Sequence, residues 1–213
     1  MYDRIQWLGH SSFVIQGPPL VYIDPWRVAR SAFHADIILI SSDMYDRCSL
    51  ADIDKLRGPD TLVIGSEAVA RQVDNCTVLR PWQSLSFDRA AIKAVPAYTP
   101  APWDQTDAAT ALGFVISINL YDIYYAGPTH IIPEMNALRP DIAILPIDGR
   151  GTLGVADAAQ VIRLMRPRWV FPANWGAYGE GATRADALAL QRMTAGQTEV
   201  IIPSSAVSTA AAG

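Results

Sequence analysis

The sequence is poor in the side chains that most often bind metal ions or crosslink a fold. Its 213 residues include three histidines and two cysteines. Cys48 and Cys76 belong to no paired-cysteine motif, which excludes a disulfide framework and a cysteine-based zinc site. The two thiols are therefore expected to be reduced, as is usual in a cytoplasmic protein.

Long apolar runs and basic runs are also missing. The apolar stretches are short and interrupted by proline, glycine or charge, so none approaches the roughly 20 residues of a membrane span. The net charge is −4 without a basic cluster, which argues against a nucleic-acid surface. The N-terminus starts directly in a charged strand, so no signal peptide is expected and a cytoplasmic location is predicted.

Half of the residues are hydrophobic, enough for a sizeable core. Their spacing predicts strands alternating with helices, without an internal linker. We expect one domain over residues 1–203 and a flexible tail over the small, polar residues 204–213. Strands are predicted at 2–7, 11–16, 20–24, 36–41, 61–65, 76–79, 84–87, 90–96, 112–119, 121–126, 142–146, 168–172 and 198–202. Helices are predicted at 50–56, 66–73, 155–166 and 183–194.

One segment carries the most information. An apolar strand, residues 36–41, runs into the polar loop Ser42-Asp43-Met44-Tyr45-Asp46-Arg47, and Ser49 can cap the helix that follows. This arrangement resembles the signature segment of the metallo-β-lactamase superfamily, and of its metal-dependent hydrolase-like members. Other blocks resemble that family in the same order, at residues 7–15, 21–26, 95–98, 124–130, 133–135, 144–147 and 170–176. The resemblance implies a four-layer α/β/β/α sandwich.

The resemblance also implies where metal ligands would lie. The family loop reads Thr-His-x-His-x-Asp-His, and here Ser42, Met44 and Arg47 stand at the histidine positions, while Asp46 matches. Serine and thioether groups are poor zinc ligands, and arginine cannot lose its proton to bind metal. The family has three later ligand positions. Asp104 falls near the first of them, and Pro128 and Asn174 stand at the other two. We therefore expect no dinuclear zinc centre and no cofactor.

Two alternatives stay open at this site. His10, Asp46, Asp104 and His130 could hold a single divalent ion, zinc or manganese. Arg47 could instead replace the metal's charge, and its guanidinium is then expected to contact an aspartate. Trp26 and the loop around Arg150 are expected near the rim of the pocket. The pocket candidates are His10, Asp24, Ser42, Asp43, Met44, Asp46, Arg47, Asp104, His130 and Asn174.

Three functions follow from these alternatives. The first is a catalytically inactive or altered descendant of the hydrolases that keeps a pocket for a small molecule, with an anion as one expected ligand. The second is a hydrolase of a small ester, lactone or phosphoester that uses the mononuclear site. The third is a non-enzymatic interaction protein, for which a homo-oligomer is one form.

Overall fold

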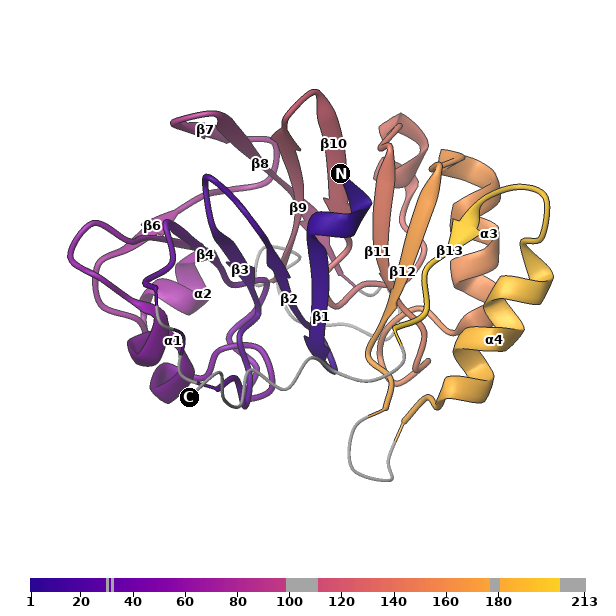
Figure 1. Cartoon of the computed structure of the whole chain (residues 1–213), viewed down its shortest axis with the longest axis horizontal. Coiled ribbons are helices and arrows are strands. Elements are labelled where there is room, and N and C mark those ends of the chain that lie inside the picture. The colour runs from indigo at the N-terminus through magenta and orange to yellow at the C-terminus, as the bar shows by residue number, and fades with distance from the viewer. Residues whose placement is uncertain (30, 32, 99–110, 177–180, 204–213) are drawn as a thin grey trace.

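Two β-sheets pack face to face, and each carries helices on its outer side (Figure 1). The computed structural model describes residues 1–29, 31, 33–98, 111–176 and 181–203. The tail at 204–213 and Asp104 therefore lie outside the described residues. Within them the four-layer α/β/β/α arrangement predicted from the sequence is confirmed.

The first sheet contains six strands in sequence order, β1-β2-β3-β4-β5-β6. Neighbouring strands are antiparallel from β1 to β3 and parallel from β3 to β6. The bounds are β1 Ile5–Gly9, β2 Ser12–Ile15, β3 Val21–Ile23, β4 Ile37–Leu39, β5 Leu62–Gly65 and β6 Cys76–Val78.

The second sheet contains seven strands in the order β13-β12-β11-β10-β9-β8-β7. Strands β7 to β10 form an antiparallel meander, and β10 to β13 run parallel. The bounds are β7 Ser84–Phe87, β8 Ala90–Ala97, β9 Ala111–Ile118, β10 Tyr121–Tyr125, β11 Ile142–Pro146, β12 Trp169–Ala173 and β13 Glu199–Val200.

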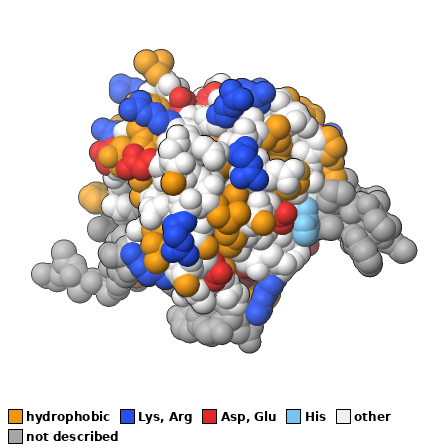
Figure 2. Space-filling view, turned by 90° about the vertical axis from the view of Figure 1, so that its right-hand side faces the viewer, with side chains coloured by type: hydrophobic (Ala, Val, Ile, Leu, Met, Phe, Trp, Pro, Cys, Tyr) orange, Lys and Arg blue, Asp and Glu red, His pale blue; other side chains and the backbone are white. Residues whose placement is uncertain are grey.

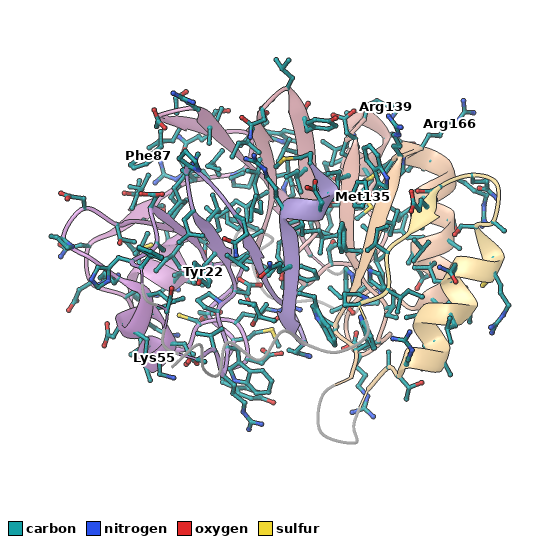
Figure 3. All side chains as sticks on the ribbon, viewed as in Figure 1. Tyr22, Lys55, Phe87, Met135, Arg139 and Arg166 are labelled. Carbon is teal, nitrogen blue, oxygen red and sulfur yellow. The ribbon has the colours of Figure 1, made fainter. Side chains whose placement is uncertain are left out.

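The helices cover the outer faces because the central strands are apolar on both sides. In β2, Phe13 faces the second sheet and lies with its ring centroid 6.5 Å from that of Tyr125, whereas Val14 joins the cluster under the first helices. This alternation is typical of strands buried on both faces. Figure 3 shows how densely the side chains fill the space between the layers. The helices are η1 Tyr2–Arg4, α1 Leu50–Leu56, α2 Glu67–Ala70, η2 Pro133–Ala137, α3 Val155–Met165 and α4 Arg184–Met193.

The element boundaries depart from the sequence predictions mainly at the ends. The predicted strand at 2–7 begins as a 3-10 turn, and its ladder starts only at Ile5. The helix predicted over 66–73 ends at Ala70, because it is followed by turns that lead into β6. Ser49 caps α1 by accepting a hydrogen bond from the backbone N–H of Asp52, as predicted.

Parallel strands bring their carboxyl ends to one edge of the molecule. The loops after β3, β4, β10, β11 and β12 all leave from such ends, and in open α/β sheets ligands usually bind beyond them. Arg139 and Arg166 precede β11 and β12 and so mark the opposite edge, at the top of Figure 3. The site is therefore sought among the loops of the carboxyl edge.

The outer surface over α3 and α4 has a mixed character. Figure 2 shows basic, acidic and apolar side chains interspersed on this face. Within the described ranges, no helix is both long enough and apolar enough to span a bilayer.

Candidate functional site

The two sheets are joined at the carboxyl edge by backbone hydrogen bonds between their loops. The N–H of Asn174 donates to the carbonyl of His10 at 2.9 Å, and the N–H of Leu112 donates to the carbonyl of Ser41 at 2.7 Å. Gly127 adopts a φ of +67°, and a Cβ there would lie 2.4 Å from the carbonyl oxygen of Leu112. Only glycine fits this approach.

Asp24 lies at the centre of the junction and is fully buried. Its Oδ1 accepts from the N–H of Ser41 at 2.7 Å, and its Oδ2 accepts from the Tyr125 hydroxyl at 2.6 Å and from Arg47 Nη1 at 2.9 Å. Burial raises the pKa of Asp24, and the charge of Arg47 with the hydrogen bonds from Ser41 and Tyr125 opposes that rise. The carboxylate is thus surrounded by donors.

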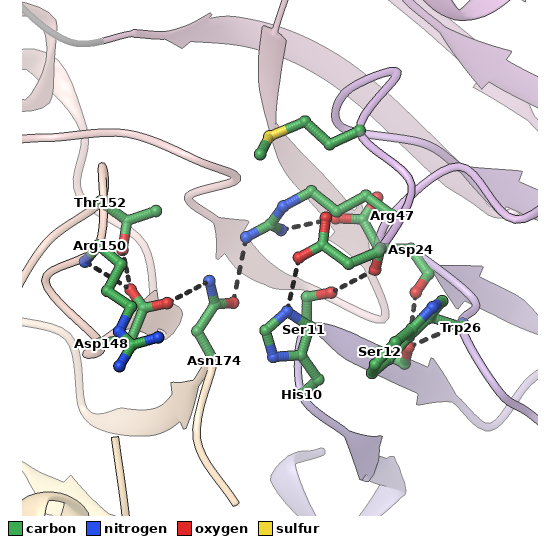
Figure 4. A network of polar contacts seen from close by, with 12 residues as sticks. His10, Ser11, Ser12, Asp24, Trp26, Arg47, Asp148, Arg150, Thr152 and Asn174 are labelled. Atoms are coloured by element: carbon green, nitrogen blue, oxygen red, sulfur yellow. Dashed lines mark hydrogen bonds and ion pairs between the residues drawn. The ribbon is translucent and has the colours of Figure 1, made fainter. Parts of the chain in front are cut away.

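Arg47 is almost as deeply buried, with 2% of its surface exposed. Besides Asp24, its Nη1 donates to the Tyr125 hydroxyl oxygen at 2.9 Å. Its Nη2 donates to Asn174 Oδ1 at 3.1 Å (Figure 4). Burial acts to lower the pKa of Arg47, but the charges of Tyr125, Asp24 and Asp46 outweigh it and raise the pKa above its ordinary value. The contact between the guanidinium and an aspartate agrees with the expectation from the sequence.

Asp46 and His10 form a second hydrogen-bonded contact beside the first. Their Oδ2 and Nε2 atoms lie 2.7 Å apart, and each side chain is 15% exposed. Burial alone would raise the pKa of Asp46, but the hydrogen bond from His10 and the charge of Arg47 lower it below its ordinary value. His10 Nδ1 and Asp46 Oδ1 are buried and have no hydrogen-bond partner among the described residues.

Asp148 extends the network on the other side of Asn174. Its Oδ2 lies 3.5 Å from Asn174 Nδ2, while its Oδ1 accepts from the backbone N–H of Arg150 and from the Thr152 hydroxyl (Figure 4). Asn174 therefore connects the buried Arg47 with the loop after β11.

These groups border a cleft of about 540 Å³, a volume within the usual range for small-molecule sites. Its walls combine charged, polar and aromatic side chains from both sheets. The lining residues are His10, Trp26, Arg27, Met44, Tyr45, Asp46, Asp148, Arg150, Asn174 and Gly181.

Four residues of this site have left-handed backbone conformations. His10, Asp24, Arg27 and Asn174 have φ values of 50°, 43°, 53° and 58°, in the region that most side chains avoid. Such conformations persist where the surrounding structure holds them. The contacts around these residues therefore hold the loops of the cleft in place.

The structure brings only part of the predicted set to the cleft. His10, Met44, Asp46 and Asn174 line it, and Asp24 and Arg47 lie buried behind it.

Three further predicted pocket residues that the structure describes do not line the cleft. Ser42 is 3% exposed, and Asp43 offers its carbonyl to Gln72. His130 is not among the described lining residues, and its N–H bonds to the carbonyl of Tyr98.

A metal ion has no suitable set of ligands among the described residues. No three histidine, cysteine, aspartate or glutamate side chains there come together closely enough to hold one. Of the mononuclear site considered from the sequence, the three described residues His10, Asp46 and His130 do not come together closely enough to hold a metal ion. The part of that hypothesis that involves Asp104 falls outside the described residues.

Comparison with known proteins identifies the family. The beta-lactamase superfamily domain matches residues 4–174. The chain belongs to this superfamily. It is 29% identical over 215 residues to the UPF0173 metal-dependent hydrolase of Thermoplasma volcanium, covering 94% of this chain and 95% of that protein. It is 28% identical to the UPF0173 metal-dependent hydrolase of Thermococcus onnurineus, covering 93% and 95%.

Solved structures agree with the assignment to the superfamily. A crystal structure from Parabacteroides distasonis that carries the name of a metal-dependent hydrolase superposes with a TM-score of 0.82 at 26% identity, over 93% of this chain and 91% of that one. Igni18, a metallo hydrolase of Ignicoccus hospitalis, superposes with a TM-score of 0.77 at 20% identity, over 93% and 94%, and shows the shared fold. The superfamily predicted from the sequence blocks is confirmed.

Proposed function

We propose that this chain is a metal-independent member of its superfamily that binds a small, anionic molecule in the cleft between the two sheets. The observation that carries the proposal is the buried ion pair between Arg47 and Asp24, with Nη1 and Oδ2 2.9 Å apart. A guanidinium cannot share its place with a cation, and it is already held by three side chains.

The charge of Arg47 takes the role that a metal ion has in holding carboxylates together. Asp24 and Asp46 would repel each other if nothing positive lay between them. Arg47 binds Asp24 directly, opposes the rise in its pKa that burial causes, and lowers the pKa of Asp46. The loop keeps its place in the fold, while its side chains differ from those that bind metal in the family.

The cleft supports ligand binding rather than a purely structural role. Arg27 and Arg150 both line it, and guanidinium groups bind carboxylate and phosphate with two parallel hydrogen bonds. The strained backbone at His10 and Arg27 fixes the walls in advance, which lowers the entropic cost of binding.

Thermal shift assays with simple anions test the proposal. Acetate, benzoate and inorganic phosphate are added to the whole protein, with sodium chloride at equal ionic strength as reference. We expect at least one anion to raise the melting temperature, and Arg150→Gln to reduce that rise. Arg139→Gln removes an exposed arginine at the opposite edge and should leave the rise unchanged. If no anion raises the melting temperature beyond the salt reference, the binding proposal is wrong.

A further inference from the structure

The inner wall of the cleft carries two hydrogen-bonding atoms without a partner among the residues that the structure describes. They are Nδ1 of His10 and Oδ1 of Asp46, and both belong to side chains that line the cleft. A buried polar atom left without a partner costs about 1–3 kcal/mol, more when it is charged. Two such atoms on one wall suit a contact with a molecule bound in the cleft.

Asp46 Oδ1 accepts hydrogen bonds. An ionised carboxylate has no proton to give, so His10 must donate from Nε2 across the 2.7 Å contact to Asp46 Oδ2. The other carboxylate oxygen, Oδ1, is then left for a donor from a bound molecule. The inner wall therefore presents a negatively charged acceptor, and it suits a group with several N–H donors.

Other walls of the same cleft carry positive charge and apolar surface. Arg27 and Arg150 contribute guanidinium groups. Trp26, Met44 and Tyr45 contribute apolar surface, and Met44 and Tyr45 are 51% and 79% exposed. The Trp26 ring contacts two neighbouring side chains. The Arg27 guanidinium lies 4.4 Å from the centroid of the ring, and the centroid of the Tyr45 ring lies 6.5 Å from it. A ligand that satisfies all these walls has a cationic donor, an anionic acceptor and an apolar body.

We propose that the cleft recognises a zwitterion of the amino-acid type, either a free amino acid or a dipeptide with apolar side chains. Its ammonium group donates to Asp46 Oδ1, and its carboxylate binds the guanidinium groups of Arg27 and Arg150. Its apolar side chain packs on Tyr45 and Met44. This inference rests on the proposed function, since it specifies the ligand of the same cleft.

Titration calorimetry with matched ligands tests the inference on the whole protein. The ligands are leucine, phenylalanine and leucyl-leucine, each with its N-acetyl derivative and its C-terminal amide. We expect at least one parent zwitterion to bind about tenfold or more tightly than either derivative, because each derivative loses one charged hydrogen-bonding group. Asp46→Asn should weaken the parent by a similar factor and leave the N-acetyl derivative unaffected.

Controls separate the inference from the proposed function. Asp54→Asn removes an exposed carboxylate on α1 and should leave binding of the zwitterion unchanged. If the N-acetyl derivatives or benzoate bind as tightly as the zwitterions, the inference is overturned while anion binding stands. If neither zwitterions nor simple anions bind, both fail. Because the ligand series is measured on the unmodified protein, the answer does not depend on whether a variant folds.

Discussion

Replacing Arg47 by methionine removes the charge from the centre of the site while keeping much of the volume. Arg47 and Asp24 are 2% and 0% exposed, so the aspartate would lose its counter-ion where water cannot replace it. Breaking a buried ion pair from one side costs roughly 3–5 kcal/mol. The N–H of Ser41 and the hydroxyl of Tyr125 still donate to Asp24, so we expect about 3 kcal/mol for Arg47→Met.

Urea denaturation at pH 7 measures this loss as a change in the free energy of unfolding. Arg47→Ala should cost at least as much as Arg47→Met, because it also leaves a cavity. The control is Arg139→Gln, whose exposed side chain hydrogen-bonds only to nearby carbonyls, and it should change stability by less than about 0.5 kcal/mol.

A double-mutant cycle shows whether the cost arises from the pair itself. Asparagine tolerates the φ of +43° at position 24, so Asp24→Asn removes the charge with little added strain. The double variant Arg47→Met/Asp24→Asn should be more stable than the sum of the single losses predicts, by about 2 kcal/mol. Single Arg47 variants as stable as the wild type, or a coupling near zero, would refute the charge-replacement account.

Three further predictions follow from the same contacts. The pKa of Asp46 is lowered from 3.8, so its contribution to stability is present above that pH and disappears as the pH falls through the lower folded value; urea denaturation curves of wild type and Asp46→Asn should differ at pH 7 and converge as the pH falls through that value. Burial raises the pKa of Cys48 and of Cys76 to about 11, so only about one thiol in a thousand is ionised at pH 8, and a disulfide reagent should react slowly until the protein unfolds. Two rapidly reacting thiols in the native protein would contradict this. Zinc-type phosphodiesterase, lactonase and β-lactamase activities should be absent or very weak, and a robust rate abolished by a chelator would exclude the metal-free proposal.

The fold could be predicted because its signals are local and repeated. Apolar runs such as residues 36–41 mark buried strands, and Ser49 marks the start of a helix. The order of the blocks that resemble the superfamily then indicated the two-sheet arrangement. The least accurate boundary was at residues 2–7, because a short 3-10 turn and a strand have similar composition there.

The site was only partly predictable, because its contacts join residues that are far apart in the chain. The pairing of Arg47 with an aspartate could be predicted from their opposite charges. Its hydrogen bond to Tyr125 joins the two sheets, and predicting it would require knowing the register of β10. Asp148 was not considered, although its position just after the carboxyl end of β11 is the signal that could have suggested it. His130 was included because it belongs to a family block, but it is not among the described residues that line the cleft.

Metal analysis of the purified protein tests the central claim most directly. The protein is prepared without chelators and without nickel affinity, and its zinc, manganese and iron are measured per chain. The variant Ser42→His/Met44→His/Arg47→His is prepared in the same way and titrated with zinc. The account predicts no stoichiometric metal in the wild type and a gain of zinc affinity in the triple variant. One or two metal ions bound to each wild-type chain would contradict it.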